Sequence, residues 1–210
     1  MGFKPEDFFV GVIDFFAILL PGAVLSFVMI DFAHGHVFGN VLPSIRTEGQ
    51  GWVLFAFSSY LLGHFVFLAG SYIDPLYNEL RGRFVPKEKD CTYLRAKEIK
   101  ETYLGDSSSE PLMNTFQWAK ANAQLRYPAA VLEIRRHEAD SKFFRSLIIV
   151  LVVLAVVLIR KPAWIETVIC LALIVVSFAR YAEQRWKAAQ RAYEYLIAME
   201  QMGGHRTQSP

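Results

Sequence analysis

The sequence predicts an all-α membrane protein with four transmembrane helices and a helical cytoplasmic domain. Four long apolar runs, each with at most one Lys, Arg or Glu, cover residues 8–33, 52–73, 143–159 and 163–179. A helix needs about 20 apolar residues to cross a bilayer core, within a range of about 17–25, so each run is long enough to span it. The polar remainder of the chain shows helix signals and no convincing strand.

The distribution of basic residues predicts how these helices are oriented. Loop 34–51 contains a single basic residue, Arg46, and the link 160–162 contains Arg160 and Lys161. Most of the other basic residues lie in segment 75–142 and near the C-terminus. Because basic loops stay in the cytoplasm, we expect a multi-pass protein with segment 75–142 and both termini in the cytoplasm.

The chain divides into four predicted parts. The Asp74-Pro75 pair marks the first boundary, because the residue before a proline avoids the helical region. In the next segment, one helix is expected to end at Gly105 and a second to begin near Pro111, with Ser109 as a candidate N-cap. The predicted parts are a transmembrane hairpin at 1–74, a cytoplasmic helical domain at 75–127, a long helical hairpin at 128–202 and a disordered tail at 203–210.

Two long antiparallel helices are expected in this C-terminal hairpin. Pro128 can stand in the first turn of a helix. No proline or glycine lies between Pro128 and Pro162, which predicts one helix over Pro128–Arg160. A second helix is predicted from Ala163 to about Met202, where both breakers are again missing. The legs of both helices would extend from the membrane into the cytoplasm.

The last of these helices carries a charge on its apolar face. Arg185 lies in the middle of that face, where a charge needs a partner. Since helices rise equally per residue, Glu138 on the other leg lies at the same height. We therefore expect a structural ion pair between Glu138 and Arg185, with a switch role for this pair as the alternative.

Both legs of the hairpin also carry a basic patch beneath the predicted membrane surface. Such cations suit anionic lipid head groups. Alternatively, arginine forks bind phosphate and an aromatic ring stacks on a base, which predicts a nucleotide-binding site. The residues of this predicted ligand site are Arg135, Arg136, Arg180, Lys187, Arg191 and Trp186.

The first apolar run has a small or polar face, which includes Gly22 and Ser26. In the second run, a small residue recurs every seven positions, at Ala56, Gly63 and Gly70, and Asp74 lies on the same face. Small residues let transmembrane helices approach closely. We therefore expect the two runs to pack on each other, or on copies of themselves, through these faces.

Features of a pore or a gate lie on and near this face. Asp14 is either an intramembrane carboxylate, with His64 as a candidate partner, or a residue at the membrane boundary. Pro21 removes a backbone hydrogen bond and, with Gly22, kinks the helix as a static packing device or as a hinge. The predicted pore or gate residues are Asp14, Pro21, Gly22, Ser26 and His64.

The sequence contains no catalytic or metal-binding constellation. Cys91 falls in the cytoplasmic segment and Cys170 in the fourth run, so the two are not expected to form a disulfide. The pair His34 and His36 has no supporting cluster of carboxylates or cysteines. We expect no metal, no cofactor and no enzymatic activity.

Three stretches, "DFFAILLPGAVL", "HEADSKFFRSL" and "RYAEQRWKAAQRAYEYL", resemble a known group of proteins. They are similar to small four-span bacterial proteins encoded beside nucleotidyltransferases in anti-phage defence, such as the membrane effectors of Hailong-type systems. The resemblance covers the first span and the C-terminal hairpin. It implies an oligomeric, nucleotide-regulated channel that depolarises the bacterial inner (cytoplasmic) membrane, with the basic patch as the signal site.

The resulting expectation is a homo-oligomeric ion channel or pore-forming effector. It would be gated by a cytoplasmic nucleotide or oligonucleotide that a partner nucleotidyltransferase makes. The alternative is a non-conducting membrane scaffold that recruits a cytoplasmic partner through segment 75–127, with Leu112, Phe116 and Trp118 facing that partner. A transporter that uses Asp14 and His64 is less well supported, because the chain shows no inverted repeat.

Overall fold

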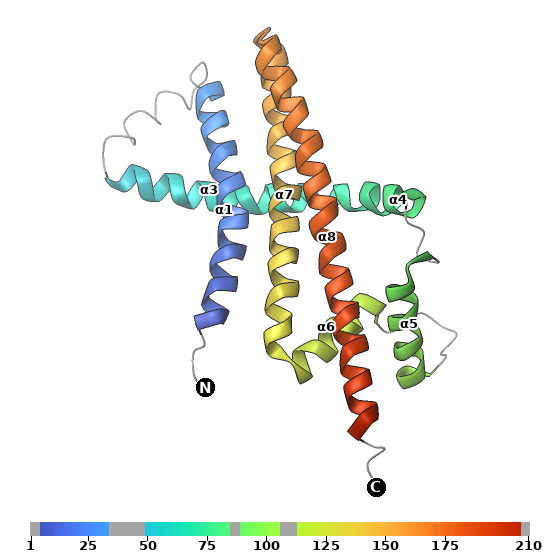
Figure 1. The fold of residues 1–210 in the computed structure, drawn as a ribbon. Helices are drawn as coiled ribbons and strands as arrows, with labels where there is room; N and C mark the ends of the chain where they lie inside the picture. Colours follow the sequence, from blue (N-terminus) through green and yellow to red (C-terminus); the bar gives the residue numbers. More distant parts are fainter. Residues whose placement is uncertain (1–4, 34–48, 85–88, 106–112, 207–210) are drawn as a thin grey trace. The chain divides into compact units, whose positions relative to one another are not determined.

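The computed structural model describes residues 5–33, 49–84, 89–105 and 113–206, and all regular structure in these ranges is helical (Figure 1). The predicted all-α class is therefore confirmed for the described part of the chain. The elements are α1 (Pro5–Ala33), α3 (Gly49–Gly70), the 3-10 turn η2 (Ser71–Ile73), α4 (Asp74–Phe84), α5 (Cys91–Leu104), α6 (Thr115–Arg126), α7 (Pro128–Arg160) and α8 (Trp164–Arg206).

Three helical stretches of the described chain are long and apolar enough to cross a membrane. They are Gly51–Arg83, Pro128–Arg160 and Trp164–Met202. In α1, the apolar stretch with described side chains, Phe15–Met29, is shorter than these three. Transmembrane-capable helices are thus confirmed, whereas a fourth span remains a prediction.

The chain forms two compact units. Residues 1–74 and 139–182 form the first, here called the apolar unit, and residues 75–138 and 183–210 form the second, the polar unit. The chain passes between them at 74/75, 138/139 and 182/183. Each passage lies at the start of or within a helix, namely α4, α7 and α8.

In the apolar unit, α1 and α3 contact each other through their small residues, as predicted. A Cβ atom at Gly22 would lie 1.9 Å from the Ser59 carbonyl oxygen, and one at Gly63 would lie 2.2 Å from the Ile18 carbonyl oxygen. The Ser59 hydroxyl donates a hydrogen bond to the Ser26 hydroxyl over 3.2 Å, and both side chains are buried. Only glycine permits backbones to approach this closely.

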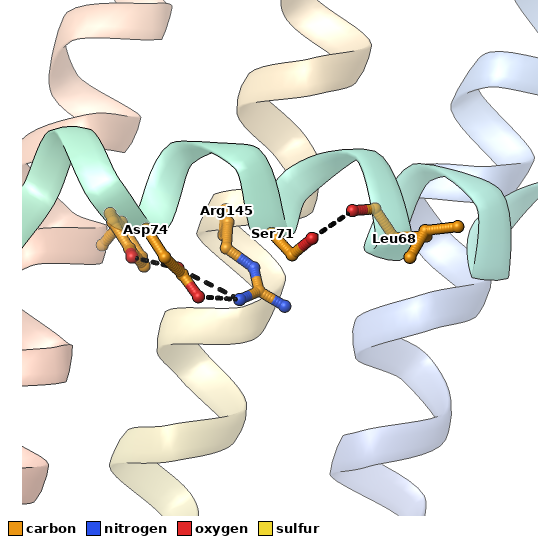
Figure 2. A network of polar contacts seen from close by, with 5 residues as sticks. Leu68, Ser71, Asp74 and Arg145 are labelled. Atoms are coloured by element: carbon orange, nitrogen blue, oxygen red, sulfur yellow. Dashed lines mark hydrogen bonds and ion pairs between the residues drawn. The ribbon is translucent and has the colours of Figure 1, made fainter.

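Figures 1 and 2 show that α3 crosses α1 and α7 at a steep angle instead of running alongside them. A steep crossing brings two helices together over a short length, so small residues are needed only near the crossing point. Within the apolar unit, α7 and α8 pack on each other around Leu151, Ala155 and Cys170. The Cys170 thiol donates to the Leu151 carbonyl oxygen over 3.1 Å.

The polar unit has a core of its own, to which α5, α6, α7 and α8 contribute. Fully buried alanines on α5 and α6 allow these short helices to pack closely, while larger side chains fill the space between the legs of α7 and α8. The buried residues of this core are Ala96, Ile99, Ala119, Ala123, Val131, Ile134, Ala192, Tyr193, Leu196 and Met199.

The described helix ends confirm some predictions and correct others. Helix α5 ends before Gly105, which has a φ of 72° and serves as the expected C-cap. Helix α6 begins at Thr115, later than predicted, because the Asn114 side chain accepts a hydrogen bond from the Gln117 backbone N–H and caps it. The alternative cap, Ser109, lies outside the described residues.

The boundary predicted at Asp74-Pro75 is not marked by a helix break, although the residue before a proline usually avoids the helical region. The chain remains helical from α3 through the 3-10 turn η2 into α4, which begins at Asp74. Pro75 is tolerated because it stands in the first turn of α4, where a backbone N–H has no intrahelical acceptor. This continuity carries the chain from the apolar unit into the polar unit as a helix.

Candidate functional site

A charged cluster within the apolar unit links the start of α4 to α7 and α8. Asp74 directly follows η2, Arg145 lies on α7 and Tyr181 lies on α8. Arg145 Nη1 donates to both carboxylate oxygens of Asp74, at 3.1 and 2.9 Å (Figure 2). The Tyr181 hydroxyl donates to Asp74 Oδ1 over 2.6 Å. One carboxylate thus receives hydrogen bonds from two other helices.

The surroundings of Arg145 hold it in place and shield it from solvent. Its side chain is 10% exposed, whereas that of Asp74 is 28% exposed. The guanidinium lies 4.7 Å from the centre of the Phe67 ring, a cation–π contact. A Cβ atom at Gly70 would lie 3.2 Å from Arg145 Cγ, so this glycine makes room for the arginine.

Burial makes this ion pair important for the arrangement of the three helices. Arg145 Nε is buried and makes no hydrogen bond within the described residues. Withdrawing charges from water costs free energy, which the pair and its hydrogen bonds offset. Removing either partner would leave a buried charge uncompensated, so the three helices are held in one arrangement by the cluster.

Sequence reasoning placed Asp74 on the small face of the second run but missed Arg145. The available signal was that Arg145 is the only Lys, Arg or Glu in the run 143–159. Charges within apolar spans are rare and usually face other helices. That rule predicts a partner for Arg145, although the pattern along one helix does not identify which residue it is.

The predicted pore or gate residues lie in different surroundings. Pro21, Gly22 and Ser26 are buried, and Gly22 and Ser26 contact α3. His64 is exposed, and its ring meets the Tyr60 ring edge-on at 4.6 Å between centroids. The side chain of Asp14 lies outside the described residues, so its pairing with His64 stays a prediction, as does the pore role of the set.

Carboxylates accompany two of the predicted ligand-binding cations. Lys187 Nζ lies 2.6 Å from Glu183 Oε1. Arg191 lies 3.0 Å from Glu133 and 2.8 Å from Glu194. An anionic ligand at these two positions would therefore compete with carboxylates of the protein itself.

The other residues of the predicted ligand site are partly or fully exposed. Arg136 and Trp186 are exposed in the polar unit, and Arg135 is half-buried there. Arg180 is exposed and belongs to the apolar unit. Their role in binding a nucleotide stays a prediction.

Glu138 and Arg185 have described partners in the polar unit. Lys120 Nζ on α6 lies 2.5 Å from Glu138 Oε2, which links α6 to α7. The Arg185 guanidinium lies 4.9 Å from the centre of the Tyr77 ring, which links α8 to α4. The direct ion pair between Glu138 and Arg185 stays a prediction.

A second carboxylate cluster lies in the polar unit around Asp90. Asp90 Oδ1 accepts from the Tyr93 backbone N–H over 3.1 Å and so caps α5. Asp90 Oδ2 accepts from Arg81 on α4 at 3.3 Å and from Gln190 on α8 at 2.8 Å. This cluster ties α4, α5 and α8 together, and sequence reasoning did not single it out.

The described residues contain no group of three His, Cys, Asp or Glu side chains that could hold a metal ion. Cys91 is exposed and Cys170 is buried, and both are free thiols. No protein-family model matches the chain, and comparisons with curated proteins and with solved structures find no match. Function therefore has to be argued from the two units and their polar clusters.

Proposed function

We propose that the chain is a homo-oligomeric ion channel or pore-forming effector of the bacterial inner (cytoplasmic) membrane. A cytoplasmic nucleotide or oligonucleotide, made by a partner nucleotidyltransferase, gates it, and conduction depolarises the membrane in anti-phage defence. In this proposal the apolar unit conducts, the polar unit receives the signal, and the protein is not an enzyme.

The continuity of α4, α7 and α8 across the two units is the single observation that carries this proposal. One unit is built from helices whose exposed surfaces are rich in large apolar side chains, such as Phe65, Trp164 and Val175. Exposed apolar surface of this extent is typical of contact with lipid. The other unit has a separate core and charged surfaces. A conformational change there can be transmitted to the membrane helices through the continuous helices that connect the two units.

In the proposed topology α1 is the first of four spans, and both termini are cytoplasmic. Helix α1 is 29 residues long, which exceeds the length that a bilayer core requires. Its buried contact with α3 at Gly22 supports a membrane location, because small residues are the usual contacts between spans. The third and fourth spans then form the hairpin whose legs extend into the cytoplasm.

Oligomerisation is proposed because one chain has too few helices to surround a water-filled pore. The exposed apolar faces of α1, α3 and α8 offer contact surfaces for lipid or for further copies. The resemblance to Hailong-type membrane effectors supports both the oligomer and the nucleotide signal. Arg135, Arg136, Arg180, Lys187, Arg191 and Trp186 are the proposed signal site.

Ion flux across liposomes that contain the purified protein tests this proposal. The probes are cyclic dinucleotides and short oligonucleotides, added on the side of the polar unit. We expect potassium flux that changes when one of these probes is present. No flux with any probe, from protein shown to be folded and inserted, would contradict the channel function.

A matched pair of variants tests the signal site. Lys187→Gln removes a predicted phosphate contact, while Lys97→Gln on α5 serves as the control, since both lysines form exposed i, i+4 pairs with a glutamate. We expect Lys187→Gln to raise the nucleotide concentration that gives half of the response about tenfold, as for a lost charge-assisted hydrogen bond. Equal responses of the two variants would remove Lys187 from the site.

The scaffold alternative keeps one specific observation in its favour. Phe116 and Trp118, which it expected to face a partner, are partly buried against the core of the polar unit, and Leu112 lies outside the described residues. However, Leu125 is 84% exposed at the end of α6, beside the exposed Tyr127. A folded, non-conducting protein whose partner is lost in Leu125→Ser would favour the scaffold.

A further inference from the structure

The residues of the Asp74 cluster, Asp74, Arg145 and Tyr181, lie near the points where the chain passes from one unit to the other. Asp74 is the last residue of the apolar unit on the first passage, and Tyr181 is one residue from the end of that unit on the third. Arg145 lies on α7 six residues after position 139, within about two helical turns of the second passage. The cluster therefore contains one residue near each passage between the units.

The bonds within the cluster tie the three passages to one another. Asp74 accepts from Arg145 through both oxygens and from Tyr181 through Oδ1. A single guanidinium nitrogen, Nη1, donates to both carboxylate oxygens, and such charge-assisted hydrogen bonds are stronger than neutral ones. Arg145 is further held between Phe67 and Gly70 of α3. A shift of any one of the three helices at this level would strain its bonds to the other two.

We propose that Asp74, Arg145 and Tyr181 form the mechanical joint through which the polar unit controls the apolar unit. The proposal rests on the proposed function in one respect, that a signal received in the polar unit changes conduction in the apolar unit. Coupling between distant sites needs a physical element that both sites influence, and helices that cross both units and share the carboxylate of Asp74 provide it. The hydrogen bonds of the joint stay intact while the three helices move together.

Hydrogen exchange of the full-length protein in lipid nanodiscs tests the joint without any ligand. The reporter is α6, since this helix belongs to the polar-unit core and its residues are not bonded to the cluster. In Arg145→Gln, we expect amide exchange in Ala119–Arg126 to become about tenfold faster, because freeing the passages loosens the core that α6 shares with α7 and α8. Arg83→Gln is the control, since it breaks the exposed pair with Glu79 on α4.

Tyr181→Phe keeps the test valid if Arg145→Gln does not fold. This variant removes one hydroxyl and preserves the buried ring. We expect α6 to exchange about threefold faster, a smaller effect because the ion pair remains. Faster exchange that is confined to residues 67–84 and 139–150, or an effect on α6 no larger than that of Arg83→Gln, would overturn the joint.

Potassium flux from liposomes separates failure of the joint from failure of the proposed function. The probe is the nucleotide that changes flux through the wild-type protein most strongly. If Arg145→Gln and Tyr181→Phe respond as the wild type does, the joint is wrong although the channel exists. If no probe makes the wild-type protein conduct, the channel function fails. The exchange of α6 then decides by itself whether the cluster couples the two units.

Discussion

The two units use a carboxylate in different ways. In the polar unit, Asp90 caps α5, and its arginine partner, Arg81, is 20% exposed. In the apolar unit, Asp74 accepts hydrogen bonds from α7 and α8, and its partner Arg145 is only 10% exposed. The first arrangement caps α5 and links it to α4 and α8, whereas the second links the start of α4 to the two long helices α7 and α8.

The packing of the helices is therefore determined by different contacts in the two units. The polar unit is held by a core of apolar side chains, to which the Asp90 cluster adds. The apolar unit exposes much of its apolar surface, so close glycine contacts and the Asp74 cluster specify its helix packing. Substitutions at polar or small residues should therefore matter more in the apolar unit.

The largest effect is expected from the comparison of the two carboxylates. Asp74→Ala should lower the free energy of unfolding by about 3–5 kcal/mol, because it leaves Arg145 buried without its counter-charge. Asp90→Ala should cost only about 1–2 kcal/mol, as for a lost N-cap, since Arg81 can turn toward water. Unfolding in mixed detergent micelles measures both, and equal losses would remove the distinction between the units.

A large effect of another kind is expected in the polar unit. Ile134 is fully buried in its core, so Ile134→Ala should lower the free energy of unfolding by about 2–4 kcal/mol through the lost contacts and the cavity left behind. Limited proteolysis should show faster cleavage in the polar unit, at α5 and α6, with the apolar unit unchanged. Equally faster cleavage of α1 would mean that the two units unfold as one.

Glycine-to-alanine substitutions should change the free energy of unfolding by a smaller amount, with a loss in the apolar unit and a gain in the polar unit. Gly22→Ala forces α1 and α3 apart, because the new Cβ atom would overlap the Ser59 carbonyl, and should cost about 1–3 kcal/mol. Gly82→Ala on α4 meets nothing within 4 Å and should stabilise the protein by about 0.5–1 kcal/mol. Thermal unfolding followed by circular dichroism compares the two variants, and a neutral Gly22→Ala would rule out the close crossing.

Local sequence patterns predicted the helices better than their contacts. The bounds of α7 match the predicted Pro128–Arg160, because its ends coincide with two prolines. The end of α5 at Gly105 and the small faces of α1 and α3 were also predicted correctly. All of these depend on residues close in sequence or on a simple periodicity, which a helical wheel captures.

The missed features depend on residues far apart in the chain. Arg145 and Asp74 are 71 positions apart and lie on helices that cross steeply, so equal heights along a hairpin give no indication of their contact. Pro75 predicted the boundary, but the sequence did not show that the helix continues through it, which its place in a first helical turn allows. Likewise, acidic partners of Lys187 and Arg191 reduce the basic character that a count of cations predicted.

The most direct test of the central claim is potassium flux across liposomes that hold the wild-type protein, measured with and without cyclic dinucleotides or short oligonucleotides. We expect one of these nucleotides to switch the flux on or off, in a preparation whose insertion is verified by protease protection. A correctly inserted protein that conducts no ions with any of the nucleotides would contradict the account.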